Sequence, residues 1–230
     1  AKDGTLNRLW LRTVRIASVV LAGLATAALL GSAQHAMPME REPQMRVLLH
    51  EGPKLLLRAD KEQTMQVRGL GAGVRRLRRL QLEQSGRGVV VVVDGRRRRL
   101  SSNIVLTVQN DDPRGIWLDS RRYRGAFQIS CRGGRLRVVN ALGIETYLAS
   151  VVGSEMPHHW PLAALKAQAV AARTYGLRER RRGGGRDVKA TVASQVYEGV
   201  EAETARTRLA VADTRSLVLV HRGKLINAVF

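Results

Sequence analysis

An alanine-rich stretch in the C-terminal third of the chain constrains the fold more than any other segment. Pro161 stands where a helix can begin, because the first turn does not need the missing N–H. Six alanines follow before residue 182, and the glycines at 183–185 mark a loop. This pattern predicts a slim helix over residues 161–182. Since small side chains let neighbouring elements approach closely, we expect this helix to be buried at the centre of a domain.

Polar side chains interrupt the alanine-rich helix at helical spacing. Lys166 and Arg173 share one face, and Gln168 and Tyr175 share an adjacent face. Uncompensated charge is costly inside a protein, so a buried helix should not carry it free. These groups therefore indicate either an internal hydrogen-bond network or the wall of a cleft, and the spacing leaves both interpretations open.

Another helix is predicted immediately before the alanine-rich one. Asn140 is a favourable N-cap, and apolar residues follow it at helical spacing as far as Val152. Gly153 is expected to end this helix. Pro157 is expected to break the chain at the corner between the two helices.

The chain before Asn140 has the character of β-structure. Short β-branched or alternating runs are separated by turn signals, such as Asp94-Gly95 after a valine run. Near the C-terminus, the pattern predicts a short helix at residues 201–214 and two strands around Arg222-Gly223. The sequence therefore predicts an α+β fold. A β-rich module spans residues 45–139, and a mixed helix and strand core built around the alanine-rich helix spans residues 140–230.

The N-terminal residues have the pattern of an export signal. Arg8, Arg12 and Arg15 precede an uncharged run over residues 16–33, which ends in small residues suited to cleavage. Residues 1–36 are therefore predicted to be a signal peptide or a retained membrane anchor, and the sequence leaves both open. Residues 37–44 contain two prolines and are predicted to be a linker. We expect a protein exported to the cell envelope that contacts the membrane through this segment.

The charge balance limits the classes of partner. The chain has 39 Lys and Arg against 19 Asp and Glu, which gives a formal net charge of +20. This excess is either solvated surface charge or the mark of an anionic partner. Aromatic residues are only 4% of the chain and no nucleic-acid reading motif is present, so nucleic acid is not predicted as a partner. The single cysteine, Cys131, lies in an alternating stretch and is interpreted as a small buried residue.

Four phrases carry a resemblance to a known family. They are YRGAFQI, VVNALGIETYLASVVGSEMP, WPLAALKAQAVAARTY and SQVYEGV, in that order. Together they resemble the stage II sporulation protein D/LytB (SpoIID/LytB) family over residues 123–230. The resemblance implies a bacterial cell-envelope protein that acts on peptidoglycan glycan strands. The activity is either that of a lytic transglycosylase, which leaves 1,6-anhydro-muramic ends, or that of a non-catalytic enhancer of a cell-wall amidase.

The resemblance also implies a role for particular residues. Glu155 falls on the catalytic acid of the family. Ala163 stands where many members have Glu, and the Cys and His zinc ligands of some members are absent, so neither a metal nor a cofactor is predicted. The family usually continues beyond the position of Phe230, and the core is therefore expected to be truncated there.

The chemistry of a lytic transglycosylase suits a single carboxylate. Ordinary glycosidases use two, whereas here one group can protonate the glycosidic oxygen and then accept the proton of the attacking C6 hydroxyl. Glu155 is the only acid between Ala149 and Lys166, although Glu145, Asp187 or Glu198 could approach it in space. Apolar neighbours would favour the protonated acid, and a nearby cation would oppose it. The cations of the alanine-rich helix are therefore expected to face substrate or hold backbone groups.

Substrate contacts are predicted around Glu155. The candidates are polar or aromatic side chains of the corner, the alanine-rich helix and the SQVYEG loop: Trp160, Lys166, Gln168, Arg173, Tyr175, Gln195 and Tyr197. Among them, Tyr197 with Gln195 is the first choice for a sugar contact, because the loop is flanked by glycine. The alternative for the aromatic residues is a place in the core. His158 and His159 are predicted at the rim and not as a metal pair, since adjacent residues on a tight corner rarely bind one ion.

Overall fold

The computed structural model describes residues 42–93, 95–109, 112–180, 186, 188–190 and 195–230. Residues 42–230 form one compact unit. The predicted leader at residues 1–36, and the predicted linker as far as residue 41, lie outside the described part. Within that part, no helix is both long and apolar enough to cross a membrane.

Two sheets dominate the described residues. Their strands are β1 (Gln44–Gly52), β2 (Lys54–Arg58), β3 (Met65–Arg68), β4 (Val74–Leu77), β5 (Arg79–Ser85), β6 (Gly88–Val93), β7 (Arg96–Ser101), β8 (Val105–Gln109), β9 (Ile116–Leu118), β10 (Arg121–Tyr123), β11 (Ala126–Arg132), β12 (Arg135–Gly143) and β13 (Val188–Lys189). The seven-stranded sheet has the order β13-β1-β12-β11-β8-β3-β4, and the six-stranded sheet has the order β10-β9-β2-β5-β6-β7. Neighbouring strands are antiparallel except β1 and β13.

Alternating burial along the strands builds one core between the sheets. In β5 and β6, Leu80, Leu82, Val89 and Val91 are buried, while the residues between them are more exposed. They belong to the same apolar cluster as the buried residues of the seven-stranded sheet. Cys131 is partly buried against this cluster, in agreement with its interpretation as a packing residue.

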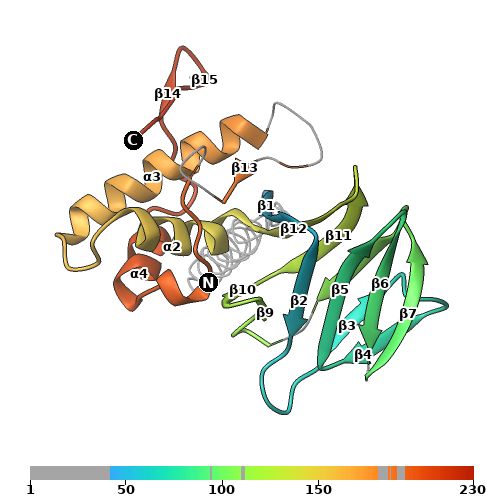
Figure 1. Cartoon of the computed structure of the whole chain (residues 1–230). Coiled ribbons are helices and arrows are strands. Elements are labelled where there is room, and N and C mark those ends of the chain that lie inside the picture. The colour runs from blue at the N-terminus through green and yellow to red at the C-terminus, as the bar shows by residue number, and fades with distance from the viewer. Residues whose placement is uncertain (1–41, 94, 110–111, 181–185, 187, 191–194) are drawn as a thin grey trace, which may run out of the picture. The chain divides into compact units, whose positions relative to one another are not determined.

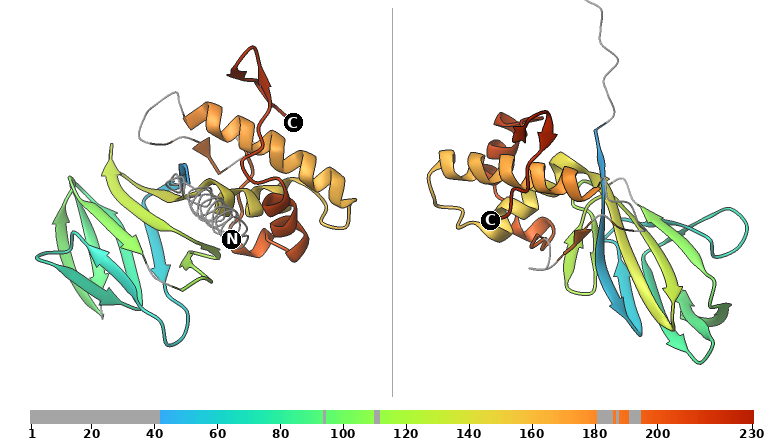
Figure 2. Two further views of the ribbon diagram at one scale, coloured as in Figure 1. Left: turned by 180° about the vertical axis from the view of Figure 1, so that it is seen from behind. Right: turned by 90° about the horizontal axis from the view of Figure 1, so that it is seen from above.

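The helices follow the strands in the sequence. They are α2 (Ile144–Glu155), α3 (Leu162–Arg180), the 3-10 turn η1 (Val200–Ala202) and α4 (Ala205–Asp213), and a small hairpin of β14 (Val220–His221) and β15 (Lys224–Leu225) comes last. Figures 1 and 2 show α2, α3 and α4 grouped beside β1, β12 and β13, with β3 to β7 at the other end of the sheets. The predicted α+β class is confirmed, as are the short helix α4 and the hairpin around Arg222-Gly223.

The predicted start of α2 is wrong, because Asn140 lies inside β12. Its side chain is fully buried, and its amide donates to the carbonyl oxygens of Arg124 at 2.8 Å and Ala126 at 3.2 Å. The strand therefore continues to Gly143 and passes directly into the helix, so that the predicted boundary between residues 139 and 140 falls within one strand. A residue distant in sequence caps the first turn of α2 instead: Glu42 accepts a hydrogen bond from the backbone N–H of Glu145.

The alanine-rich helix forms close to its predicted bounds. It begins at Leu162, the residue after Pro161, whose carbonyl accepts from the backbone N–H of Leu165. It is described as far as Arg180, and the glycines at 183–185 lie outside the described residues. Leu165, Ala169 and Ala172 have no exposed surface. The helix is therefore buried along one side, whereas Ala163 and Ala167 on its other side are exposed, so it is not enclosed as its small side chains had led us to expect.

Candidate functional site

Glu155 is the last residue of α2 and opens the corner that leads to α3. The helix continues two residues past Gly153 and ends where the backbone N–H of Met156 bonds to the carbonyl of Val152. Pro157 follows, as predicted for the corner. Glu155 is partly exposed, and its Oε1 accepts a hydrogen bond from the backbone N–H of Val196 at 2.7 Å. The carboxylate is therefore both reachable from solvent and fixed in orientation.

The bond from Val196 is one of three backbone N–H bonds that hold residues 196–199 along α2. The backbone N–H of Glu198 donates to the Ser154 hydroxyl at 3.2 Å, and that of Gly199 donates to the Ser150 hydroxyl at 2.9 Å. The segment and the residues that follow it also meet arginines near β10, in the ion pairs Arg121–Glu198, Arg122–Glu201 and Arg124–Glu203. Two distant parts of the chain thus clamp this segment beside Glu155.

Gly153 lies within α2 because the returning chain leaves no room for a side chain. A Cβ atom at this position would lie 1.9 Å from the carbonyl oxygen of Ala202. The prediction that Gly153 ends the helix is wrong for this reason. The glycine serves a close approach between α2 and η1, which local sequence alone does not reveal.

Substitution Gly153→Ala should therefore destabilise the protein by about 1–3 kcal/mol, since the backbone of η1 must shift. Gly176→Ala is the matched control in the interior of α3, where a Cβ atom would approach nothing closer than 3.4 Å. The control should raise stability by up to about 1 kcal/mol, because alanine is the better helix former. Urea midpoints of the two variants measure the difference. Equal stabilisation of both would contradict the close approach.

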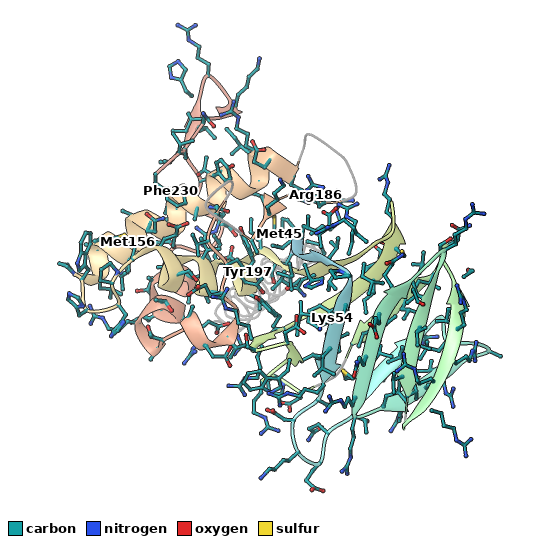
Figure 3. All side chains as sticks on the ribbon, viewed as in Figure 1. Met45, Lys54, Met156, Arg186, Tyr197 and Phe230 are labelled. Carbon is teal, nitrogen blue, oxygen red and sulfur yellow. The ribbon has the colours of Figure 1, made fainter. Side chains whose placement is uncertain are left out.

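Three tyrosines from separate phrases of the sequence meet behind Glu155. The ring centroid of Tyr197 lies 5.4 Å from that of Tyr123 and 5.0 Å from that of Tyr147. The Tyr197 hydroxyl donates to Asn140 at 3.0 Å, and the Tyr147 hydroxyl donates to Gln195 at 2.9 Å. Figure 3 marks Tyr197 among the packed side chains between the helices and the strands. The phrases that carry the family resemblance are therefore brought together mainly by packing.

Burial excludes Tyr197 and Gln195 as sugar contacts in this structure. The exposed fraction is 2% for Tyr197 and 0% for Gln195, whose amide donates to the carbonyl of Ala172. Neither side chain offers a surface on which a sugar could lie. Tyr197 therefore has the core position that the sequence left open as the alternative. The glycine beside the loop indicates a tight turn of the backbone. It does not show which side of the loop packs against the rest of the protein.

Burial also raises the pKa of these tyrosines. The pKa of Tyr197 lies well above its ordinary value of 10.0 because the phenolate would be desolvated, and the nearby Tyr123 and Tyr147 add to the effect. Burial raises the pKa of Tyr147 in the same direction, with smaller contributions from Tyr175 and from Glu155. Tyr147 thus lies within electrostatic reach of the candidate carboxylate.

The raised pKa of Tyr197 makes stability fall in alkaline solution. Above the ordinary value of 10.0, the unfolded chain loses the tyrosine proton while the folded protein keeps it. The contribution of this tyrosine to the free energy of unfolding is therefore complete below that pH. Above it, the free energy of unfolding should fall by up to about 1.4 kcal/mol per pH unit for each such tyrosine. Tyr197→Phe should lower stability near neutral pH, where the bond to Asn140 is lost, but flatten this alkaline slope in denaturant titrations. An unchanged slope would contradict the burial of the hydroxyl.

Arg173 is part of an internal network. Its guanidinium is 1% exposed and pairs with both carboxylate oxygens of Glu145, at 3.0 and 2.7 Å. It also donates to the carbonyl oxygens of Val211 and Leu217. Arg173 therefore joins α2, α3 and the C-terminal segment, and it is not a substrate contact in this structure.

The other candidates of α3 divide by exposure. Lys166 is half-exposed and pairs with Asp213 of α4 at 2.7 Å. Gln168 is buried, and Tyr175 is partly buried. Neither Lys166 nor Arg173 contacts Glu155. Of the two arrangements expected for these cations, facing substrate or holding backbone groups, Arg173 has the second.

The corner after Glu155 presents exposed rings. Trp160 is 44% exposed, and both histidines before it are exposed as well. Arg206 of α4 fixes the corner by donating to the carbonyl oxygens of His158 at 3.0 Å and Trp160 at 2.7 Å. In the described residues, no group of three or more His, Cys, Asp or Glu side chains could hold a metal ion.

The carboxylates around the corner differ in their partners. Glu145 pairs with Arg173, Glu198 with Arg121 and Asp213 with Lys166. Within the part of the chain that the structure describes, Glu155 makes no ion pair, and Asp187 lies outside that part. Two cavities in the described residues, of about 460 and 330 Å³, are lined by residues other than Glu155.

The fold and the site first define a class: an α+β protein with one unpaired, partly exposed carboxylate at a helix corner that a returning loop fixes. Comparison with known proteins then gives a family match over part of the chain. Residues 132–221 match the family model described as stage II sporulation protein (SpoIID). The resemblance drawn from the sequence is thereby confirmed over this segment.

Two relatives are each similar to part of the chain. An uncharacterised protein of Brachyspira hyodysenteriae is 38% identical over 119 residues, which are 50% of this chain and 32% of that protein. The amidase enhancer of Bacillus subtilis is 43% identical over 83 residues, which are 36% of this chain and 11% of that protein. The chain thus spans about a third of the length of one relative and about a tenth of the other.

Proposed function

We propose that this chain acts at the bacterial cell wall, where it cleaves peptidoglycan glycan strands as a lytic transglycosylase with Glu155 as acid and base. The family match and the relative named amidase enhancer support a role related to the cell wall and a place in the cell envelope. The predicted leader at residues 1–36 fits this location and would bring the protein to the membrane.

One observation carries the assignment of Glu155. It is partly exposed at the corner and makes no ion pair within the described residues, whereas Glu145, Glu198 and Asp213 are each held by a cation. A general acid must carry a proton, and an adjacent cation would favour the ionised carboxylate instead. Glu155 is thus the carboxylate of this corner that is partly exposed and makes no ion pair within the described residues.

The proposed reaction moves one proton out and one back. Glu155 donates its proton to the glycosidic oxygen as the bond from that oxygen to C1 of muramic acid breaks. The C6 hydroxyl of the same sugar forms the new bond to C1, and its proton returns to Glu155. No water is consumed, so a second carboxylate to activate water is not needed. The bond from Val196 to Oε1 orients the group and leaves Oε2 for the proton.

The exposed rings of the corner are the proposed substrate surface. Trp160 is large and exposed, and Tyr175 and Glu155 both contribute to the raised pKa of Tyr147. Aromatic faces suit the flat apolar side of a sugar ring. We retain Trp160, Tyr175 and Lys166 as proposed substrate contacts, because their side chains keep exposed surface in this structure.

The alternative is a non-catalytic protein that binds peptidoglycan and stimulates a cell-wall amidase. The name of the Bacillus subtilis relative favours it. Two incubations of the purified full chain separate the proposals. With peptide-stripped glycan strands alone, the transglycosylase should form 1,6-anhydro ends detectable by mass spectrometry. An enhancer should leave the strands intact and raise the rate of peptide release only when an amidase is added.

A further inference from the structure

The edges of the two sheets carry the most concentrated positive charge in the described residues. Strand β7 is the edge of the six-stranded sheet and contains four consecutive arginines at positions 96–99. Strand β4 is the edge of the seven-stranded sheet and contains Arg75 and Arg76. Figure 1 shows both strands at the end of the sheets away from α2 and α3. The proposed cell-wall reaction uses none of these residues.

Strand pairing tells which of the arginines point toward the core. Val91 is 2% exposed and pairs with Arg98, and Val93 pairs with Arg96. Directly paired residues lie on the same face of a sheet, so Arg96 and Arg98 occupy core-facing positions of β7. Arg97 and Arg99 lie on the outer face. There Arg97 approaches Glu83 at 3.9 Å, and Arg99 donates to the carbonyl of Ser85.

The same reasoning applies to β4. Val67 is fully buried and pairs with Arg75, so Arg75 also occupies a core-facing position. The inward arginines of both edges line one cavity of about 460 Å³, together with Leu70, Val91 and Val93. The cavity therefore has an apolar floor and three cationic side chains, and it lies where the two sheet edges part.

Nothing in the described residues neutralises this cavity. Arg75, Arg96 and Arg98 have no carboxylate partner there, in contrast to the ion-paired Arg97. A single inward charge protects a sheet edge from pairing with another chain. Three like charges that converge on one cavity repel one another, and an anion with more than one negative charge would offset this repulsion.

We infer that this cavity binds the phosphoryl group of an anionic ligand. Guanidinium groups bind phosphate through paired hydrogen bonds, and phosphate can carry two or more charges where a carboxylate carries one. The phosphate could belong to a free phosphoryl anion or to the headgroup of a lipid, and the apolar floor accepts either. This site is separate from Glu155 and lies beyond the proposed reaction.

A matched pair of variants of the full chain tests the site. Arg96→Gln/Arg98→Gln removes the inward charges, and Arg97→Gln/Arg99→Gln removes as many charges from the outer face of the same strand. Titration calorimetry with tripolyphosphate should show a loss of affinity of at least about tenfold for the inward pair, as expected for lost charge-assisted hydrogen bonds. The outer pair should change affinity by less than about threefold, since Arg97 and Arg99 do not line the cavity.

Further arms identify the source of the phosphate. Citrate is the polycarboxylate control, and vesicles of phosphatidylglycerol are compared with vesicles of phosphatidylcholine. Dependence on Arg96 and Arg98 with tripolyphosphate supports a free phosphoryl ligand, and the same dependence with phosphatidylglycerol alone supports a lipid headgroup. Equal losses for both variant pairs, equal binding of citrate, or no binding by the unmodified chain would overturn the inference. Arg75→Gln against Arg76→Gln repeats the comparison if the first variants do not fold.

Discussion

Replacing Arg173 with methionine should destabilise the protein by about 3–5 kcal/mol. The guanidinium is 1% exposed, and its loss leaves the Glu145 carboxylate, which is 12% exposed, without its cation. It also removes the bonds to the carbonyl oxygens of Val211 and Leu217, which attach the C-terminal segment to α3. Chemical denaturation followed by circular dichroism measures the change.

Lys166→Met is the control for Arg173, because it removes the same charge from the same helix. The pair between Lys166 and Asp213 is more than a third exposed on both sides, so its loss should cost at most about 1 kcal/mol. The double variant Arg173→Met/Glu145→Met leaves no unpaired charge and should recover much of the stability. Equal effects of Arg173→Met and Lys166→Met would contradict the internal network.

Replacing Glu155 with glutamine should lower the rate of glycan cleavage by about a hundredfold to ten-thousandfold, the usual contribution of a general acid and base. Glutamine keeps an oxygen that can accept from the backbone N–H of Val196, and no ion pair within the described residues is lost. The thermal midpoint should therefore stay close to that of the unmodified protein. Cleavage rates on peptide-stripped strands, measured beside the melting curve, give both quantities.

Ser154→Ala separates chemistry from anchoring. The Ser154 hydroxyl accepts from the backbone N–H of Glu198, so this variant loosens the same segment without touching the carboxylate. It should retain most of the cleavage rate. If it loses as much activity as Glu155→Gln, the importance of Glu155 lies in holding residues 195–199 and not in proton transfer.

Local pattern predicted the parts of the fold that local interactions form. Helix α3 follows from its alanines and from Pro161, and α4 begins at Ala205 after its N-cap Thr204, which forms a capping box with Thr207. Errors arose where a distant group decides the outcome. In the first turn of α2, the backbone N–H of Glu145 donates to Glu42, which lies 103 residues earlier in the chain. A side chain at Gly153 is excluded by the carbonyl oxygen of Ala202. Neither contact leaves a trace in the sequence around the helix.

The candidate site shows the same division. Glu155 could be selected from the sequence because it is the only acid between Ala149 and Lys166, and the structure leaves it partly exposed. Polar residues on a slim helix were compatible with a cleft or with a network, and only packing shows that Arg173 lies inside. Tyr197 illustrates the limit most clearly, since its hydroxyl is bound by Asn140 from a strand that precedes α2.

The most direct test of the central claim is the fate of solvent oxygen during cleavage of peptide-stripped glycan strands. The reaction is run in water labelled with heavy oxygen, and the new ends are analysed by mass spectrometry. The proposed mechanism predicts 1,6-anhydro ends without label, formed by the unmodified protein and by Ser154→Ala but not by Glu155→Gln. Label in the new ends, or anhydro ends formed at an undiminished rate by Glu155→Gln, would contradict it.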